Sequence, residues 1–80
     1  MTVNDACAKK IIKLIQAKKI TQYRLEKDSG VTHGAMNRIL MGKNNTITLT
    51  TLFKICLALD ISPIEFLDDE LFDFNKIEVD

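Results

Sequence analysis

The sequence contains no tryptophan, one proline, three glycines and two cysteines, and these low counts exclude several classes of protein. A structural zinc site takes about four closely spaced ligands, whereas the single histidine here is His33. Cys7 and Cys56 each lie in an apolar helical pattern, which predicts two reduced, buried side chains and no disulfide. No apolar run approaches the roughly 20 residues needed to cross a bilayer, and no signal-peptide pattern is present. We therefore expect a cytoplasmic protein without a membrane partner, a metal or a cofactor.

Residue patterns that carry catalysis are also missing. There is no pair of carboxylates in an apolar segment, no Ser/His/Asp set and no glycine-rich loop that cradles a phosphate, so we expect no enzyme. Hydrophobic residues make up 46% of the chain, which is an ordinary value for a globular protein and argues against disorder. Eighty residues are enough for one domain with a small core.

The formal net charge is zero, but the charges are unevenly distributed. Residues 1–45 contain nine basic and three acidic side chains, which gives +6. Residues 46–80 contain two basic and eight acidic side chains, which gives −6. This asymmetry is typical of a nucleic-acid-binding face with an acidic opposite end, although two solvated surfaces would give the same pattern.

Hydrophobic periodicity and helix end signals predict an all-α fold of five short helices. Their expected ranges are about 5–18, 22–29, 33–41, 49–59 and 63–67. The expected N-caps are Asn4 or Asp5, then Thr21, Thr32, Thr48 and Ser62. The last of these starts a capping box, with Pro63 at the first helical position and Glu65 three residues after the cap.

Core positions follow from the same periodicity. The predicted anchors include Ile11 and Ile12 in the first helix, Leu25 in the second, and Phe66 and Leu67 in the fifth. For the fourth helix we expect one core-facing stripe, made of Leu49, Leu52, Phe53, Cys56 and Leu59. The lysines of the first helix, Lys9, Lys10 and Lys13, are interpreted as solubilising residues on its other faces.

The chain after residue 67 has a different composition. Residues 68–70 are all acidic, and apolar residues such as Phe72 and Phe74 then alternate with polar ones. This pattern fits a short strand, a hydrophobic arm or a frayed terminus. We therefore divide the chain into a domain at 1–67 and an acidic, aromatic tail at 68–80 that is a candidate dimer or partner arm.

The most informative segment is the predicted turn between the second and third helices. Two short helices joined by a three- or four-residue turn with glycine form a helix-turn-helix unit. Here Gly30 permits an unusual backbone angle, Val31 fills the angle between the helices, and Thr32 caps the third helix. The exposed N-terminus of that helix suits a phosphate or the entrance of a DNA groove.

Side chains on the predicted outer face of the third helix match base edges in the major groove. Arginine can donate two hydrogen bonds to guanine and asparagine can bond adenine in the same way, which makes Arg38 and Asn37 candidate base readers. His33 can donate or accept. Gly34 and Ala35 allow close approach, although Gly34 costs about 1 kcal/mol within a helix.

These residues closely resemble the phage Cro/repressor (XRE) type of helix-turn-helix domain, across about residues 5–67. The matching runs are Thr21-Gln22-Tyr23-Arg24-Leu25, Gly30-Val31-Thr32, Met36-Asn37-Arg38-Ile39, Gly42-Lys43, Thr48-Leu49-Thr50-Thr51-Leu52-Phe53-Lys54-Ile55 and Leu59-Asp60-Ile61-Ser62. The resemblance implies a compact five-helix bundle like that of lambda repressor. It also implies a homodimer on a two-fold DNA operator.

The resemblance also assigns roles to individual positions. It implies that Gln22 holds a phosphate and that the 43–46 loop touches the DNA backbone through Lys43, Asn44, Asn45 and Thr46. It implies base reading from Thr32, His33, Gly34, Asn37 and Arg38, with Thr32 more a cap and backbone contact than a reader. The chain departs from the family at Glu26, where a small alanine is common, and at Ser29, where leucine is usual. We expect Glu26 to tilt outward or to pair with Arg24 or Lys27, and both departures to loosen the packing.

Together these features predict a sequence-specific transcription regulator, with a repressor as the first interpretation. One alternative is an antitoxin that represses its own operon and binds a toxin through the acidic tail. The other is a protein-interaction adaptor that uses the helix-turn-helix fold without specific DNA binding. Salt dependence separates a DNA-binding protein from an adaptor. A protein with several phosphate contacts loses DNA affinity steeply as salt rises, whereas an adaptor with a mainly apolar interface does not.

Overall fold

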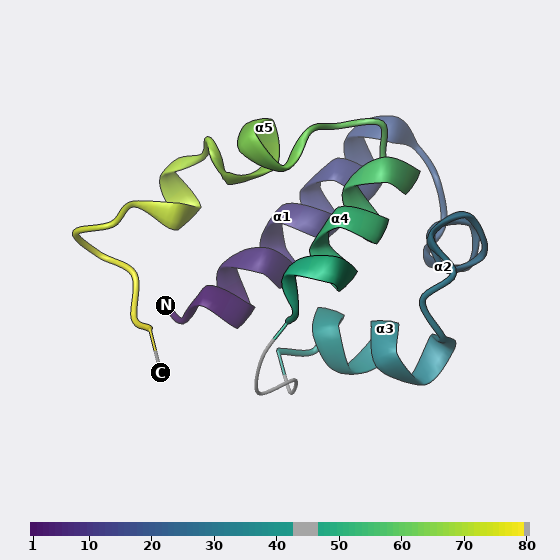
Figure 1. Ribbon diagram of the computed structural model, residues 1–80, viewed down its shortest axis with the longest axis horizontal. Helices are drawn as coiled ribbons and strands as arrows, with labels where there is room; N and C mark the ends of the chain where they lie inside the picture. The colour runs from purple at the N-terminus through teal and green to yellow at the C-terminus, as the bar shows by residue number, and fades with distance from the viewer. Residues whose placement is uncertain (43–46, 80) are drawn as a thin grey trace.

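The computed structural model describes residues 1–42 and 47–79, and these form an all-helical bundle (Figure 1). The elements in chain order are α1 (Val3–Lys18), α2 (Gln22–Ser29), α3 (His33–Leu40), α4 (Leu49–Ala58), α5 (Pro63–Leu67) and the 3-10 helix η1 (Glu70–Phe72). The expected all-α bundle of five helices is confirmed. Within the described residues, no helix combines the length and the apolar character needed to span a bilayer.

Each α-helix begins at a hydroxyl side chain that accepts the backbone N–H three residues later. The caps are Thr2, Thr21, Thr32, Thr48 and Ser62, with hydrogen bonds of 3.1–3.2 Å. Four of these caps were predicted, and at Ser62 the hydroxyl also donates to the carboxylate of Glu65 at 3.3 Å. The prediction was wrong for α1, which begins at Val3 because Thr2, rather than Asn4 or Asp5, satisfies its first free N–H groups.

The core is built where α1, α3 and α4 pack around the apolar sides of α2 and α5. Its largest fully buried side chains are Phe66, Ile11, Leu25, Met36, Ile55 and Leu59. Cys7 and Cys56 are both free and buried in this cluster, as predicted. Burial, with a smaller contribution from Cys56, raises the pKa of the Cys7 thiol to about 11, so both residues serve as small hydrophobes.

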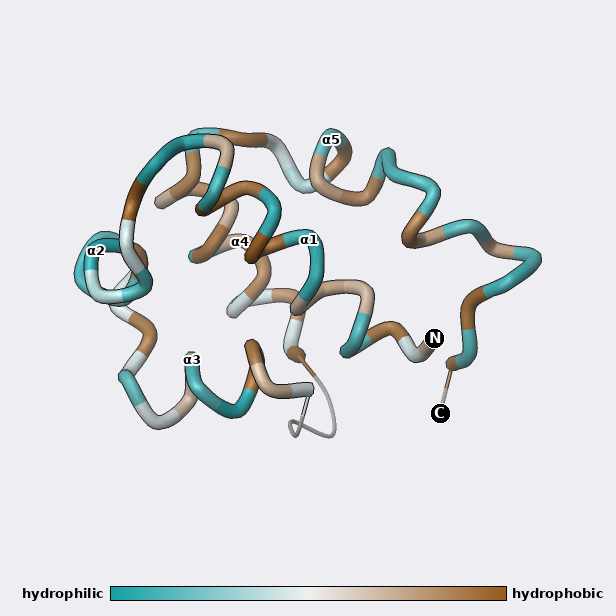
Figure 2. Tube along the Cα trace, turned by 180° about the vertical axis from the view of Figure 1, so that it is seen from behind, coloured by the Kyte–Doolittle hydropathy of each residue, from teal (hydrophilic) through white to brown (hydrophobic). Residues whose placement is uncertain are grey.

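The predicted core stripe of α4 was wrong in two positions. The side chains of Leu52, Cys56 and Leu59 are buried, but Leu49 is 67% exposed and Phe53 is 46% exposed. Ile55, which was left out of the stripe, is fully buried. The reason is that α4 is apolar around most of its circumference, as Figure 2 shows by contrast with the hydrophilic α2, so periodicity does not determine which face turns inward. Ile12 and Leu67 are likewise partly exposed rather than in the core.

The chain after α5 folds back along α1 toward the N-terminus (Figure 1). Phe72 in η1 packs on Phe66 with ring centroids 5.9 Å apart. Near its end, the chain pairs with the N-terminus through an isolated parallel bridge between Thr2 and Glu78. The described part of the tail is therefore a packed arm with one 3-10 turn, rather than a regular strand or a frayed end.

An ion pair fixes this arm to the bundle. The carboxylate of Asp69 accepts hydrogen bonds from the Nζ atoms of Lys10, at 2.8 Å, and Lys13, at 3.1 Å. The side chains of Asp69 and Lys10 are 6% and 10% exposed. The interpretation of Lys10 as a solubilising residue was wrong, because its ammonium group lies under the arm and pairs with a carboxylate 59 residues away.

Candidate nucleic-acid interface

The turn between α2 and α3 is closed by local hydrogen bonds. Gly30 adopts a left-handed conformation (φ 76°), and its N–H donates to the carbonyl of Glu26 at 2.9 Å. The hydroxyl of Ser29 accepts the N–H of Val31 at 3.2 Å and donates to the carbonyl of Glu26 at 3.4 Å. Val31 is buried between the helices as predicted. The small polar Ser29 thus stabilises the turn through its hydroxyl group.

Helix α3 has one buried face and one exposed face. Met36 and Ile39 lie in the core, whereas Thr32, His33, Gly34, Asn37 and Arg38 are all exposed. Thr32 accepts the N–H of Ala35 at 3.2 Å, so its side-chain oxygen caps the helix while its hydroxyl group remains on the exposed surface. The N-cap Thr32 and the four expected α3 positions therefore lie on one open surface of the molecule.

Gly34 and Arg38 are neighbours on this surface. A Cβ atom placed on Gly34 would lie 3.7 Å from Nη1 of Arg38, an ordinary van der Waals distance. The guanidinium group therefore extends back over the first turn of α3, toward its N-terminus. Because Gly34 carries no side chain, nothing from that position lies between Arg38 and solvent, and a planar donor is presented there.

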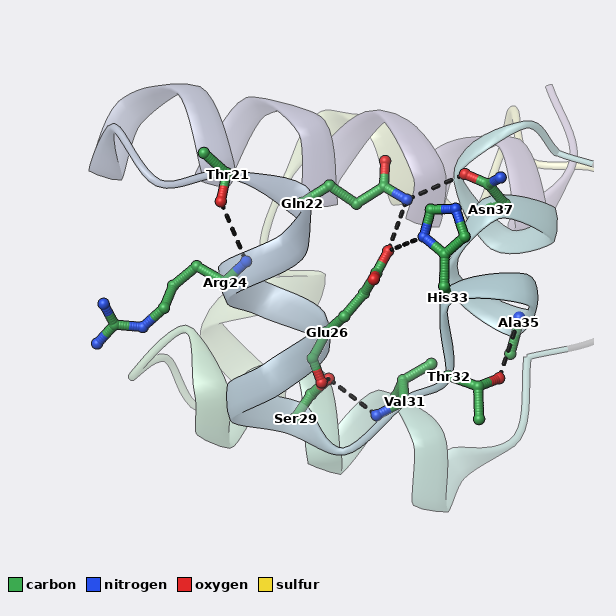
Figure 3. A network of polar contacts seen from close by, with 10 residues as sticks. All are labelled: Thr21, Gln22, Arg24, Glu26, Ser29, Val31, Thr32, His33, Ala35 and Asn37. Atoms are coloured by element: carbon green, nitrogen blue, oxygen red, sulfur yellow. Dashed lines mark hydrogen bonds and ion pairs between the residues drawn. The ribbon is translucent and has the colours of Figure 1, made fainter.

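A network of polar side chains joins α2 to the exposed face of α3 (Figure 3). Its centre is Oε2 of Glu26, which lies 2.8 Å from Nε2 of Gln22 and 2.8 Å from Nδ1 of His33. Nε2 of Gln22 also donates to Oδ1 of Asn37 at 3.0 Å. The side chain of Glu26 is 10% exposed and that of His33 is 72% exposed, so the carboxylate lies beneath the surface that the others form.

The charge state of Glu26 is set by this network. The hydrogen bond from Gln22, followed by the hydrogen bond and charge of His33, lowers the pKa of the Glu26 carboxyl below its ordinary value. The carboxyl is therefore ionised at neutral pH. The expected partners, Arg24 and Lys27, were wrong: Arg24 bonds Asp28 on the outer side of α2 at 2.7 Å.

The sequence predicted that Gln22, His33 and Asn37 belong to this surface, but it did not predict the hydrogen bonds that connect them through Glu26. The helical spacing of Gln22 and Glu26, four residues apart, was the signal for that contact. The contacts of Glu26 with His33 and of Gln22 with Asn37 cross the turn, so they depend on the angle between two helices. Of the remaining candidates, Lys43, Asn44 and Asn45 lie outside the described residues, as does Thr46.

The described residues contain no group of three or more His, Cys, Asp or Glu side chains arranged to hold a metal ion. The surface offers instead two helix N-termini, one guanidinium group, two amides and an imidazole. These groups suit hydrogen bonding to phosphates and base edges.

Comparison with known proteins agrees with this geometry. A family model described as a Cro/C1-type HTH DNA-binding domain matches residues 10–71, which include α2, the turn, α3 and the core helices α4 and α5. No curated protein and no solved structure matches the chain. The resemblance inferred from the sequence is thus confirmed, and the chain belongs to the Cro/C1-type helix-turn-helix family of DNA-binding domains found in transcription regulators.

Proposed function

We propose that this protein is a sequence-specific repressor that inserts α3 into the DNA major groove and binds a two-fold operator as a homodimer. The observation that carries the proposal is the exposed face of α3, where His33, Asn37 and Arg38 are presented together beside a free helix N-terminus. A helix with its side chains is about 10–12 Å across, which matches a major groove about 12 Å wide.

Arg38 is the strongest candidate for direct base recognition. Its guanidinium group forms no ion pair among the described residues, whereas Arg24 is paired with Asp28. An unpaired guanidinium can donate two parallel hydrogen bonds to O6 and N7 of guanine. Asn37 and His33 lie on the same face and reach neighbouring base edges, while Thr32 and the N-termini of α2 and α3 hold phosphates.

Register on the duplex would come from contacts to the DNA backbone. The sequence resemblance assigns such contacts to Lys43, Asn44 and Asn45, which follow Met41 and Gly42 after the end of α3 in the sequence. Every phosphate contact by a lysine or arginine releases counterions, so we expect the DNA affinity to fall steeply with salt.

The outer face of α4 is the surface best suited to a second copy of the chain. Leu49, Phe53 and Leu57 recur at intervals of four residues and are 67%, 46% and 80% exposed. Phe53 and Leu57 also line a groove of about 320 Å³, which Pro63 of α5 borders on its other side. Lys54 is the single charged residue of α4, so this face suits an identical apolar face better than a charged partner.

Repression would then follow from occupancy, because a dimer that covers one operator excludes other proteins from the same DNA. A two-fold dimer places its recognition helices about 34 Å apart, so that both face the same side of the duplex.

The test is selection of bound sequences from random duplex DNA with the wild type, Arg38→Ala and Arg24→Ala. We expect an enriched two-fold motif with the wild type, and loss of preference at one position of each half-site with Arg38→Ala. Arg24→Ala removes the same charge from a paired arginine, so it should keep the wild-type motif. The absence of any enriched motif would refute the proposal and direct attention to exposed apolar residues of the arm, such as Phe74.

A further inference from the structure

We propose that Glu26 is a specificity-determining residue that reaches DNA only through its neighbours. Its carboxylate fixes which hydrogen-bonding group Gln22 and Asn37 present to the base edges, and it orients the ring of His33 beside them. This inference rests on the proposed role of α3 as the recognition helix. The match to the family gives no role to Glu26.

The first step follows from the chemistry of a carboxylate, which accepts hydrogen bonds and donates none when ionised. Oε2 of Glu26 lies 2.8 Å from a side-chain nitrogen of Gln22 and 2.8 Å from one of His33. Both neighbours must therefore turn an N–H group toward Glu26. With a side chain only 10% exposed, Glu26 has little competition from water for these contacts.

The second step concerns the amide of Gln22, which has two N–H hydrogens. One is directed at Glu26 and the other at Oδ1 of Asn37, 3.0 Å away. Both donors are used within the protein, and Figure 3 shows the carbonyl oxygen of Gln22 pointing away from both partners. Gln22 therefore presents an acceptor.

The third step extends the pattern to α3. Because Oδ1 of Asn37 receives the hydrogen bond from Gln22, its amide nitrogen is left to present donors. Because the ionised carboxylate of Glu26 only accepts, Nδ1 of His33 must carry the proton that it donates, and the ring turns Nε2 away from Glu26. One largely covered carboxylate thus sets an acceptor at Gln22 and a donor at Asn37, and it directs the ring of His33 through Nδ1.

This arrangement predicts which bases are selected. An acceptor in the major groove pairs with the amino group of adenine or cytosine, whereas a donor pairs with O6 or N7 of guanine, N7 of adenine or O4 of thymine. A phosphate offers only acceptors. Gln22 in this state is therefore a reader of base amino groups, in place of the phosphate ligand that the sequence resemblance implied.

Without Glu26, the amides of Gln22 and Asn37 have no fixed direction. A Gln–Asn pair hydrogen bonds equally well after both amides rotate by half a turn, and the rotated pair presents the opposite groups. Glu26→Ala removes the carboxylate that orients the two amides, and alanine is a strong helix former that suits α2. Glu26→Gln removes the charge but retains a carbonyl oxygen that can occupy the place of Oε2.

The experiment compares sequence selection by the wild type, Glu26→Ala, Glu26→Gln and Asp28→Asn. Asp28→Asn is the matched charge control, because it neutralises an acid of the same helix whose side chain, among the described residues, bonds Arg24 alone. We expect Glu26→Gln and Asp28→Asn to bind all DNA more tightly with an unchanged motif. Glu26→Ala should reduce discrimination about tenfold at the positions read by Gln22 and Asn37.

The free protein provides a second readout that needs no DNA. In NMR spectra, the side-chain amide signals of Gln22 and Asn37 should shift in Glu26→Ala and remain in place in Asp28→Asn. If Glu26→Ala keeps the wild-type motif, the inference about Glu26 is refuted while the proposed function stands. A motif that changes equally in Glu26→Ala and Glu26→Gln also overturns it, because charge and not direction would then be responsible. The absence of any wild-type motif overturns the proposed function first.

Discussion

Replacing Asp69 by asparagine should destabilise the bundle more than any other charge-neutralising change in the described part of the chain. The Asp69 carboxylate is 6% exposed and accepts hydrogen bonds from Lys10, Lys13 and the backbone N–H of Leu71. Asparagine keeps an oxygen for Leu71, but it leaves the ammonium group of Lys10 facing a neutral side chain. Lys10 is itself 10% exposed and cannot fully recover its hydration.

The magnitude follows from this geometry. Breaking a fully buried ion pair costs about 3–5 kcal/mol. Here Lys13 is 63% exposed and contributes little, and the long side chain of Lys10 can bend toward solvent. We therefore expect a loss of about 2 kcal/mol in the free energy of unfolding, or a fall in Tm of about 10 °C for a domain of this size.

The pH dependence provides an independent check. The hydrogen bond from Leu71, followed by those from Lys10 and Lys13, holds the pKa of the Asp69 carboxyl well below its usual range. Since the folded-state pKa is depressed, the stabilisation is fully present above the unfolded pKa of about 4 and is lost as the pH falls below that value. The stability difference between wild type and Asp69→Asn should therefore shrink in acid.

Urea denaturation at pH 7 and pH 3, followed by circular dichroism, measures both effects. Asp68→Asn is the matched control, because Asp68 is the exposed neighbour of Asp69 and should change stability by less than about 0.5 kcal/mol. If the Asp69→Asn variant were as stable as this control at pH 7, the arm would not be held by its ion pair.

Two further predictions concern an exposed apolar side chain and a buried thiol. Leu57→Glu places a charge on the apolar face of α4, where Leu57 is 80% exposed, so it should spare the monomer and weaken self-association at least tenfold. Sedimentation velocity measures this, with Thr50→Glu as a control on the same helix, and equal association of both variants would locate the dimer elsewhere. Cys7, with a pKa of about 11, should not react with Ellman's reagent at pH 8 until the protein unfolds. Rapid labelling of Cys7 in the native protein would contradict its burial.

The sequence predicted those features that depend on residues close together in the chain. The caps at Thr21, Thr32, Thr48 and Ser62 each involve a hydroxyl and an amide three residues apart, so their spacing was sufficient. The open face of α3 followed from the same periodicity that buries Met36.

Features that depend on the direction of an element in space were not predictable in this way. The inward face of α4 is chosen by its packing against α2 and α5, because apolar residues surround most of the helix. Lys10 and Asp69 lie 59 residues apart, and no local pattern pairs them. The partner of Glu26 on α3 depended on the crossing angle that Gly30 and Ser29 give to the turn.

The contact between Lys10 and Asp69 also orders events during synthesis. A ribosome releases α1 long before it adds residue 69, so every nascent chain passes through a stage in which Lys10 has no carboxylate to neutralise it. Helices α1 to α4 can assemble during that stage, with Lys10 bent toward water. The arm then closes over α1 when Asp69 emerges, so a segment made later holds a helix made earlier.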